Sequence, residues 1–220
     1  MFENPVQGIF AIFALFLGAT MHEYAHGQVA DWLGDDTPRQ QGRLTINPIP
    51  HIDLFGSILL PALLYFASGF FFAYAKPVQV NPMNFRNPRR GMLYCSLAGP
   101  AANLIIAIAA ALLLHGLAFA GNLGLTAVLS EQFFGLLLLL AMMMILVNLI
   151  LALFNLIPIP PLDGSKVVMH FLPLELAMRY ARLAPFGFII LLVLINTPLL
   201  NWYYGLVLMP LFHLLTGGLG

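Results

Sequence analysis

The chain has 220 residues, of which 60% are hydrophobic and only 8% are charged, and its nine basic and nine acidic residues cancel. A soluble globular domain carries about 25% charged residues, so this composition excludes a water-facing globular protein. It predicts an all-α membrane protein with several spans. The neutral charge balance gives no surface for nucleic acid, and a single cysteine excludes both an internal disulfide and a cysteine-rich zinc site.

The apolar stretches predict about five to six membrane helices within a single domain over residues 1–220. Apolar residues 54–75 are interrupted by Pro61 and Gly69, and residues 76–80 alternate as an extended segment does. A re-entrant, β-containing insertion is therefore expected after the first helix. In chain order, the expected parts are a helix over 5–33, a loop and re-entrant region over 34–90, helices over 91–120 and 132–157, a short amphipathic piece up to about Arg182, and C-terminal helices within 184–216, of which the last covers about 199–216.

Charge placement predicts the orientation of the chain in a cell membrane. All nine lysines and arginines lie in the stretches 39–43, 76–90 and 166–182, whereas the N-terminus and residues 121–131 have none. The positive-inside rule places the three basic stretches in the cytoplasm. Because the first two share a side, residues 54–75 cannot cross the membrane only once, which supports the re-entrant interpretation.

The sequence His22-Glu23-Tyr24-Ala25-His26 follows an apolar run without charge from Pro5 to Met21. Two histidines four residues apart share one face of a helix and can bind a single zinc ion. The adjacent Glu23 can act as general base toward a zinc-bound water, which would be the nucleophile. An ionisable cluster inside a membrane is costly, so it indicates a functional site near the cytoplasmic face.

A catalytic zinc ion usually has three protein ligands, so a third must come from elsewhere. Asp163 follows a long apolar span within a proline-rich turn, and the predicted topology brings it to the same membrane face as the histidines. An alternative role for Asp163 is the N-cap of a following helix. A glutamate could also be the third ligand, and the candidates later in the chain are Glu131 and Glu175. Glu131 lies on the opposite side in this topology, and Glu175 has no second helical motif around it. One zinc ion bound by His22, His26 and Asp163 is therefore expected.

Several motifs resemble the site-2 protease family of intramembrane zinc metallopeptidases, in its short bacterial branch without PDZ or CBS domains. They are HEYAH, AGPAAN at 98–103 and NLIPIPPLDG at 155–164, together with GRLTINPIPHIDLFGSILLP and AKPVQVNPMNFRNPRR. The resemblance implies zinc bound by His22, His26 and Asp163, with Glu23 as general base. It implies cleavage of a transmembrane helix in a membrane-protein substrate. It also suggests Asn155 as a donor to substrate or oxyanion, although Asn155 could equally cap or cross-link helices.

A scissile peptide must be extended, and addition to a strand edge is one physical way to hold it. The candidate edge is Lys76, Pro77, Val78, Gln79 and Val80, although these residues could form a plain surface strand or linker. Asn103 is a candidate substrate contact, with a hydrogen bond across helices as the alternative. His51 and Asp53 could form a second metal or regulatory site, or a hydrogen-bonded pair within a loop.

Two other functions compete with an intramembrane protease. Histidines and carboxylates can line the path of a metal-ion transporter, but no inverted repeat is found and a transporter does not need a glutamate between the histidines. An inactive scaffold that binds transmembrane helices is the other alternative, and the presence of His22, Glu23, His26 and Asp163 argues against it. The sequence predicts a transmembrane substrate and the lipid bilayer as partners, and it specifies neither the substrate nor the oligomeric state.

Overall fold

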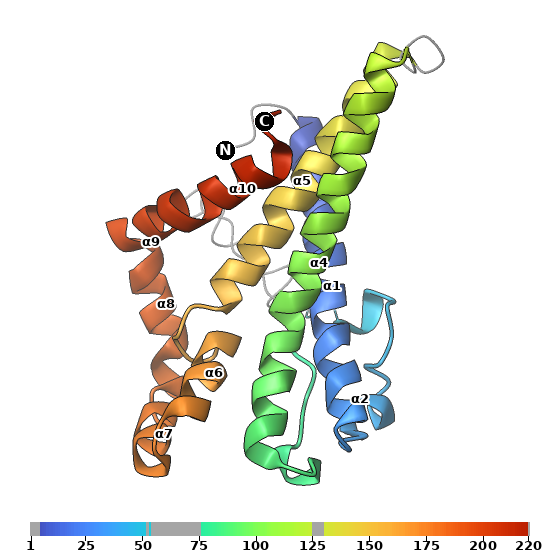
Figure 1. Ribbon diagram of the computed structural model, residues 1–220. Coiled ribbons are helices and arrows are strands. Elements are labelled where there is room, and N and C mark those ends of the chain that lie inside the picture. Colours follow the sequence, from blue (N-terminus) through green and yellow to red (C-terminus); the bar gives the residue numbers. More distant parts are fainter. Residues whose placement is uncertain (1–4, 52, 54–75, 125–129, 220) are drawn as a thin grey trace.

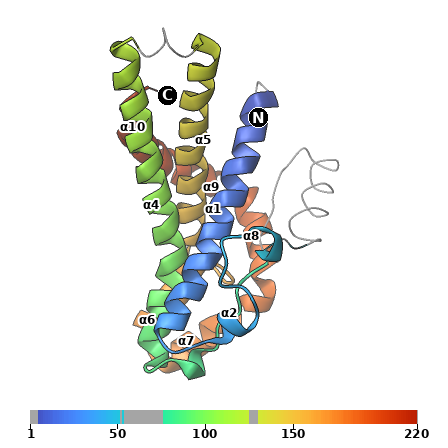
Figure 2. The same ribbon diagram turned by 90° about the vertical axis from the view of Figure 1, so that its right-hand side faces the viewer.

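The computed structural model describes residues 5–51, 53, 76–124 and 130–219, and every regular element among them is a helix. Three long helices, α1 (Pro5–Trp32), α4 (Pro88–Asn122) and α5 (Glu131–Asn155), lie side by side (Figures 1 and 2). The shorter elements are α2 (Thr37–Gln40), η1 (Ile49–His51), η3 (Pro82–Asn84), α6 (Asp163–Phe171), α7 (Leu174–Ala181), η5 (Ala184–Phe186), α8 (Gly187–Ile195), α9 (Pro198–Tyr203), the π-helix η6 (Tyr204–Leu208) and α10 (Met209–Thr216).

The core forms where small residues of α4 meet branched residues of α5. Ala107, Ala110, Ala111 and Leu114 of α4 pack against a buried row on α5 that consists of Ala141, Ile145, Leu149 and Leu153. In a membrane there is little hydrophobic force between helices, so small residues that allow close backbone approach supply the packing. Leu208 of η6 closes this core from the C-terminal side.

Five of the described helical segments are long and apolar enough to cross a membrane. Large apolar side chains on their outer faces are exposed, including Ile9, Leu112 and Leu214. An exposed apolar surface of this extent is typical of contact with lipid. The prediction of an all-α, multi-span membrane protein is therefore confirmed. The five segments are Pro5–Trp32, Pro88–Asn122, Glu131–Asn155, Leu174–Leu194 and Pro198–Thr216.

Helix boundaries agree with the sequence within a few residues for α1, α4 and α5, and they differ in the C-terminal part. The single amphipathic piece expected up to residue 182 is two helices, α6 and α7, separated at Pro173. The last apolar helix contains a π-helical turn between α9 and α10. Residues 54–75, on which the re-entrant prediction falls, lie outside the described residues. Within the described ranges Lys76–Val80 is not part of a strand.

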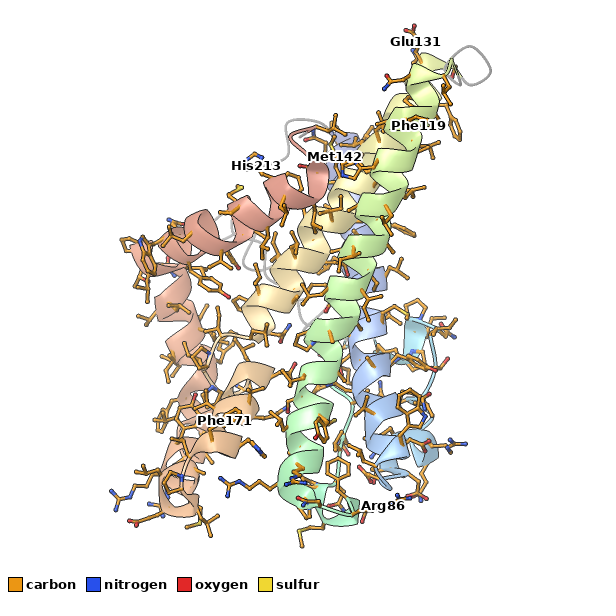
Figure 3. All side chains as sticks on the ribbon, in the orientation of Figure 1. Arg86, Phe119, Glu131, Met142, Phe171 and His213 are labelled. Carbon is orange, nitrogen blue, oxygen red and sulfur yellow. The ribbon has the colours of Figure 1, made fainter. Side chains whose placement is uncertain are left out.

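The basic stretches gather at one end of the molecule. The labelled Arg86 and Glu131 mark opposite ends in Figure 3, and α2, the start of α4 and α7 all lie toward the Arg86 end in Figure 1. α1 and α5 run toward this end and α4 runs away from it. The start of α6 therefore follows α5 back to the end that carries the second half of α1.

Candidate active site

Two helices bring the three expected metal ligands to one buried point. His22 and His26 project from α1, and Asp163 is the first residue of α6. Both Nε2 atoms lie 3.1 Å from the same carboxylate oxygen, Asp163 Oδ2. All three residues are buried. Within the described part of the chain they are the one group of three or more such side chains whose ligand atoms converge, within 4.8 Å of one another.

The other ring nitrogen of each histidine is already in use. His22 Nδ1 donates to Asn103 Oδ1 at 2.6 Å, and His26 Nδ1 donates to the Cys95 carbonyl at 2.6 Å. A carbonyl oxygen can only accept, so Nδ1 carries the proton and the lone pair of each neutral ring is on Nε2. Bonds of this kind commonly orient metal-binding histidines and fix their tautomer.

The three side chains are better suited to bind a divalent cation than to hydrogen-bond one another with both histidines protonated. To bond Asp163 Oδ2 without a cation, each Nε2 would also need a proton, which would make both rings imidazolium cations in a buried site. Two buried cations facing one carboxylate are costly. A zinc ion would use the Nε2 lone pairs and the carboxylate directly, and two histidines with one carboxylate are a common ligand set for catalytic zinc.

The face of α4 that meets the histidines repeats every fourth residue. Cys95 accepts from His26, Gly99 lies against both rings, and Asn103 accepts from His22. A Cβ atom at Gly99 would lie 2.5 Å from Nε2 of His22 and of His26, so only glycine leaves these atoms their space. On α1, Gly18, His22 and His26 repeat with the same spacing, and the Gly18 carbonyl accepts from Asn103 Nδ2 at 3.0 Å. Residues four apart share a helix face, so the two rows face each other.

The Asn103 amide is held from three sides. Its Nδ2 donates to the Gly18 carbonyl and to Asn148 Oδ1 at 2.9 Å, which leaves Oδ1 to accept from His22. The side chain is 0% exposed. This placement favours the hydrogen bond across helices that was the alternative for Asn103, and contact with substrate remains a prediction.

Asp163 is oriented by the turn between α5 and α6. Leu162 occupies the N-cap position and Asp163 begins the helix, so the carboxylate is not the helix cap. A Cβ at Gly164 would collide with the backbone of Leu156, and glycine therefore lets α6 begin against the end of α5.

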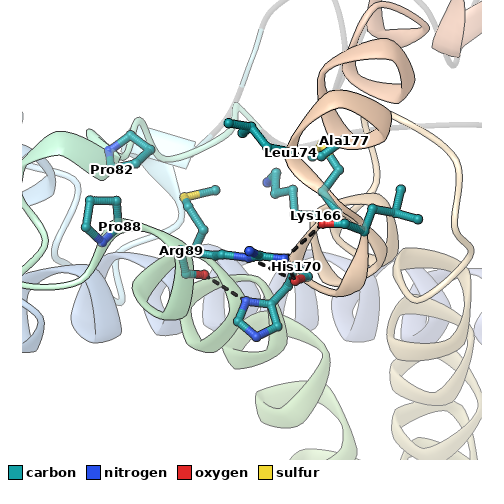
Figure 4. A pocket seen from close by; sticks show the side chains of 10 residues that line it. Pro82, Pro88, Arg89, Lys166, His170, Leu174 and Ala177 are labelled. Atoms are coloured by element: carbon teal, nitrogen blue, oxygen red, sulfur yellow. Dashed lines mark hydrogen bonds between the residues drawn. The ribbon is translucent and has the colours of Figure 1, made fainter.

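Lys166 connects this carboxylate to a neighbouring cavity. Its Nζ donates to Asp163 Oδ1 at 3.1 Å, so the two carboxylate oxygens have separate partners. The cavity, of about 330 Å³, lies between the start of α4 and helices α6 and α7 (Figure 4). At its edge the Arg89 guanidinium donates to the carbonyls of His170 and Leu172, which joins α4 to the end of α6.

Glu23 is half-buried beside His22 and contacts the segment Lys76–Val80. The backbone N–H of Val78 donates to Glu23 Oε2 at 2.7 Å. Lys76, Pro77 and Gln79 are exposed, whereas Val78 and Val80 are half-buried. The structure thus brings the expected base and the expected substrate edge into direct contact.

The remaining candidates lie elsewhere. Asn155 ends α5, and its Nδ2 donates to the Leu151 carbonyl of the same helix at 2.9 Å, so its role as a donor to substrate remains a prediction. His51 Nε2 donates to the Thr45 carbonyl at 2.9 Å, as in a loop hydrogen bond.

Sequence reasoning missed Cys95, Gly99 and Lys166 as parts of the site. The four-residue spacing of Cys95, Gly99 and Asn103 was the signal that could have revealed the first two.

Comparison with known proteins identifies a family and several relatives of the chain. The family model of peptidase family M50 matches residues 10–195. The chain is 40% identical over 193 residues to the Bacillus subtilis protein YwhC, named as a candidate zinc metalloprotease, with 86% of this chain and 81% of that protein covered. It is 30% identical over 213 residues to Rip2 of Mycolicibacterium smegmatis, named in the same way, with 90% and 71% covered. No solved structure matches the chain.

The family match extends over the part of α1 that carries both histidines and over the start of α6, which carries Asp163. Both relatives are covered over more than two thirds of their length, so the likeness is not confined to a short motif. The chain belongs to peptidase family M50, the site-2 protease family that its motifs resemble, and it is a zinc-dependent membrane protease.

Proposed function

We propose that the chain is an intramembrane zinc endopeptidase that hydrolyses a peptide bond in or near a transmembrane helix of a membrane-protein substrate. Its zinc ion is bound by His22, His26 and Asp163, and Glu23 is the general base. The observation that carries the proposal is the convergence of both Nε2 atoms on Asp163 Oδ2, 3.1 Å from each, while both Nδ1 atoms are bonded elsewhere.

The residues divide the chemistry between them. Zinc bound in this site supplies a water of lowered pKa and polarises the scissile carbonyl. Glu23 takes a proton from the attacking water and returns it to the leaving amine, as a general base that then becomes a general acid. Asn103 and the Cys95 carbonyl keep the rings in one orientation, and Lys166 holds the second oxygen of Asp163. Asn155 would donate to the developing oxyanion after leaving its bond to Leu151.

The substrate binds in an extended form, because the peptide bonds of a helix are shielded by its own turns. Lys76–Val80 is the edge on which it would lie, by strand addition. Two observations support this role: the segment touches Glu23 through Val78, and the backbone groups of Gln79 and Val80 have no hydrogen-bond partner among the described residues.

The site faces the cytoplasmic side of the cell membrane in this proposal. The support is the gathering of the basic stretches at the end of the molecule where α6 begins (Figure 1). Single cysteines at the exposed positions Gln41 and Arg86 should react with an impermeant maleimide from the same side, and one at Asn122 from the other side. The native Cys95 is buried and provides the background control.

The function is tested by measuring zinc content in the detergent-purified chain and cleavage in cells. Wild type and Glu23→Gln should each contain about one zinc, whereas Asp163→Ala should contain much less. A panel of tagged single-span membrane proteins, co-expressed with each variant, should be cleaved by wild type alone. Glu131→Gln, a carboxylate at the opposite end of the molecule, is the matched control and should behave as wild type.

Each result has a distinct meaning. Cleavage by Glu23→Gln at the wild-type rate would refute the role of Glu23 as base. Zinc retained in Asp163→Ala would refute the three-ligand site. Zinc binding without cleavage of any panel member by wild type, together with metal uptake into liposomes, would favour the transporter alternative.

A further inference from the structure

A buried carboxylate outside the zinc site is left unused by the proposed chemistry. Asp35 lies just after α1 and is 0% exposed. Its Oδ1 accepts from the Thr37 backbone N–H at 3.2 Å, from the Thr37 hydroxyl at 2.5 Å and from Asn84 Nδ2 at 2.8 Å. Its Oδ2 accepts from the Asn81 backbone N–H at 2.6 Å. Four donors on one buried carboxylate are more than a turn after a helix needs.

The two bonds to Asn81 and Asn84 cross from the end of α1 to a segment far along the chain. That segment begins where Lys76 N–H donates to the His51 carbonyl at 2.8 Å, and it leaves where Arg86 N–H donates to the Leu33 carbonyl at 3.3 Å. Among the described residues, the charged side chains that hydrogen-bond to residues 77–85 are those of Glu23 and Asp35. The bond from Asn81 N–H to Asp35 is therefore the backbone anchor that follows Val78, as the bond from Lys76 N–H to His51 is the one that precedes it.

Only two residues separate this anchor from Val78, whose N–H contacts the general base. Asn81 N–H is bound to Asp35, and Val78 N–H is bound to Glu23 Oε2 at 2.7 Å. The residues between them, Gln79 and Val80, carry the backbone groups that are free among the described residues. A shift at Asn81 would therefore move both the partner of Glu23 and the edge offered to substrate.

We infer that Asp35 is a positioning residue of the peptidase: it clamps Asn81 and Asn84 so that the segment Lys76–Val80 keeps its backbone against Glu23 and its free edge in place for substrate. The inference rests on the proposed roles of Glu23 and of this segment. Asp35 does not serve as the partner of a surface ion pair with Arg39, because the nearby Arg39 pairs with Asp31 instead.

Asp35→Asn removes one acceptor oxygen and keeps the shape of the side chain. Its single oxygen should stay with the three donors that now surround Oδ1, so its amide nitrogen would face Asn81 N–H and that hydrogen bond would be lost. A second change, Asn84→Asp, supplies an acceptor for this amide and frees the oxygen to return to Asn81. Asp36→Asn is the matched control, because the exposed Asp36 carboxylate accepts from the Gln40 side chain and, among the described residues, bonds none of residues 77–85.

The experiment measures amide hydrogen exchange and cleavage in zinc-loaded protein. In Asp35→Asn, exchange at Asn81 and Val78 should rise about tenfold to a hundredfold, which is the effect of losing a hydrogen bond to a charged group. Per zinc-loaded molecule, kcat/KM for the best-cleaved substrate of the panel should fall about tenfold or more, mainly through KM. Asp35→Asn/Asn84→Asp should recover both quantities, and Asp36→Asn should change neither.

Unchanged exchange at Asn81 and Val78 in Asp35→Asn would overturn the clamp. Faster exchange with unchanged kcat/KM, or a deficit that the double variant does not recover, would reduce Asp35 to a structural role. Failure of the proposed function is distinguishable, because it appears as cleavage by Glu23→Gln or as an inactive wild type. In both cases the exchange measurement still reports on the clamp.

Discussion

The glycine between the two histidine rings gives the sharpest test of the metal site. In Gly99→Ala the new Cβ would lie 2.5 Å from Nε2 of both His22 and His26, about 0.9 Å short of the 3.4 Å at which ordinary contact begins. Because Cβ is fixed to the α4 backbone, the rings must move. Zinc–ligand distances in a working site vary by only about 0.2 Å, so this displacement is several times the tolerance.

The expected result is a large loss of zinc affinity without loss of the fold. Removing a residue that merely supports a ligand lowers metal affinity about 10–100-fold, and Gly99→Ala displaces two ligands directly. We expect at least a hundredfold weaker binding, equivalent to about 2.8 kcal/mol. The helix itself should tolerate the change, since alanine is a better helix former than glycine by about 1 kcal/mol.

Gly116→Ala provides the matched control in the same helix, because a Cβ there meets nothing within 4 Å. Zinc affinity would be measured by competition with a chromogenic chelator, and helix content by circular dichroism. Gly116→Ala should bind zinc as wild type does. Wild-type affinity in Gly99→Ala would show that zinc is not held at the point where the Nε2 atoms converge.

Three further predictions concern the residues around the site. Asn103→Ala removes the acceptor for His22 Nδ1 and should weaken zinc binding about 10–100-fold in the same competition assay; unchanged affinity would contradict its supporting role. Gly18→Ala places a Cβ 2.6 Å from Asn148 Oδ1 and should lower the free energy of unfolding by about 1–3 kcal/mol, whereas Gly135→Ala, with open space around its Cβ, should not. Burial raises the pKa of Asp35, but hydrogen bonds from Thr37, Asn81 and Asn84 outweigh it, so the pKa is lowered from its ordinary 3.8. Asp35 should therefore stabilise the fold fully above pH 4, and the difference in denaturant midpoint between wild type and Asp35→Asn should shrink as the pH falls through the lowered pKa; a difference independent of pH would refute this.

The sequence predicted the parts of the site that local spacing determines. The two histidines lie four residues apart on an apolar run, so the pattern alone placed them on one helix face. The position of Asp163 could be predicted from the order of the membrane spans alone. After α5 the chain must be back at the end of the molecule that holds the second half of α1. The long helices could also be predicted from the sequence, since their apolar runs are long enough to cross a bilayer.

Two of the missed residues contribute through a backbone atom or through the absence of a side chain. Cys95 acts by its carbonyl, which every residue type has, and Gly99 acts by the space it leaves. The contacts of Asp35 with Asn81 and of Glu23 with Val78 join segments 46 and 55 residues apart. Such contacts depend on how the chain returns to α1, and the local periodicity of the sequence does not predict that path. The division of residues 163–182 at Pro173 was visible in the sequence as a proline and was overlooked.

The matched rows on α1 and α4 explain how a membrane helix pair can carry a polar site. Gly18, His22 and His26 on one helix meet Cys95, Gly99 and Asn103 on the other, and the bonds between them satisfy both Nδ1 atoms and the Asn103 amide within protein. Since lipid cannot satisfy these groups, their mutual pairing removes the cost of burying them. Only the Nε2 atoms remain for a metal. Their third partner, Asp163, comes from a separate helix held by Gly164 against the end of α5. The packing of α1 on α4 therefore orients the histidines without a contribution from α6, and the proposed site depends on the turn before α6 only for its expected third ligand.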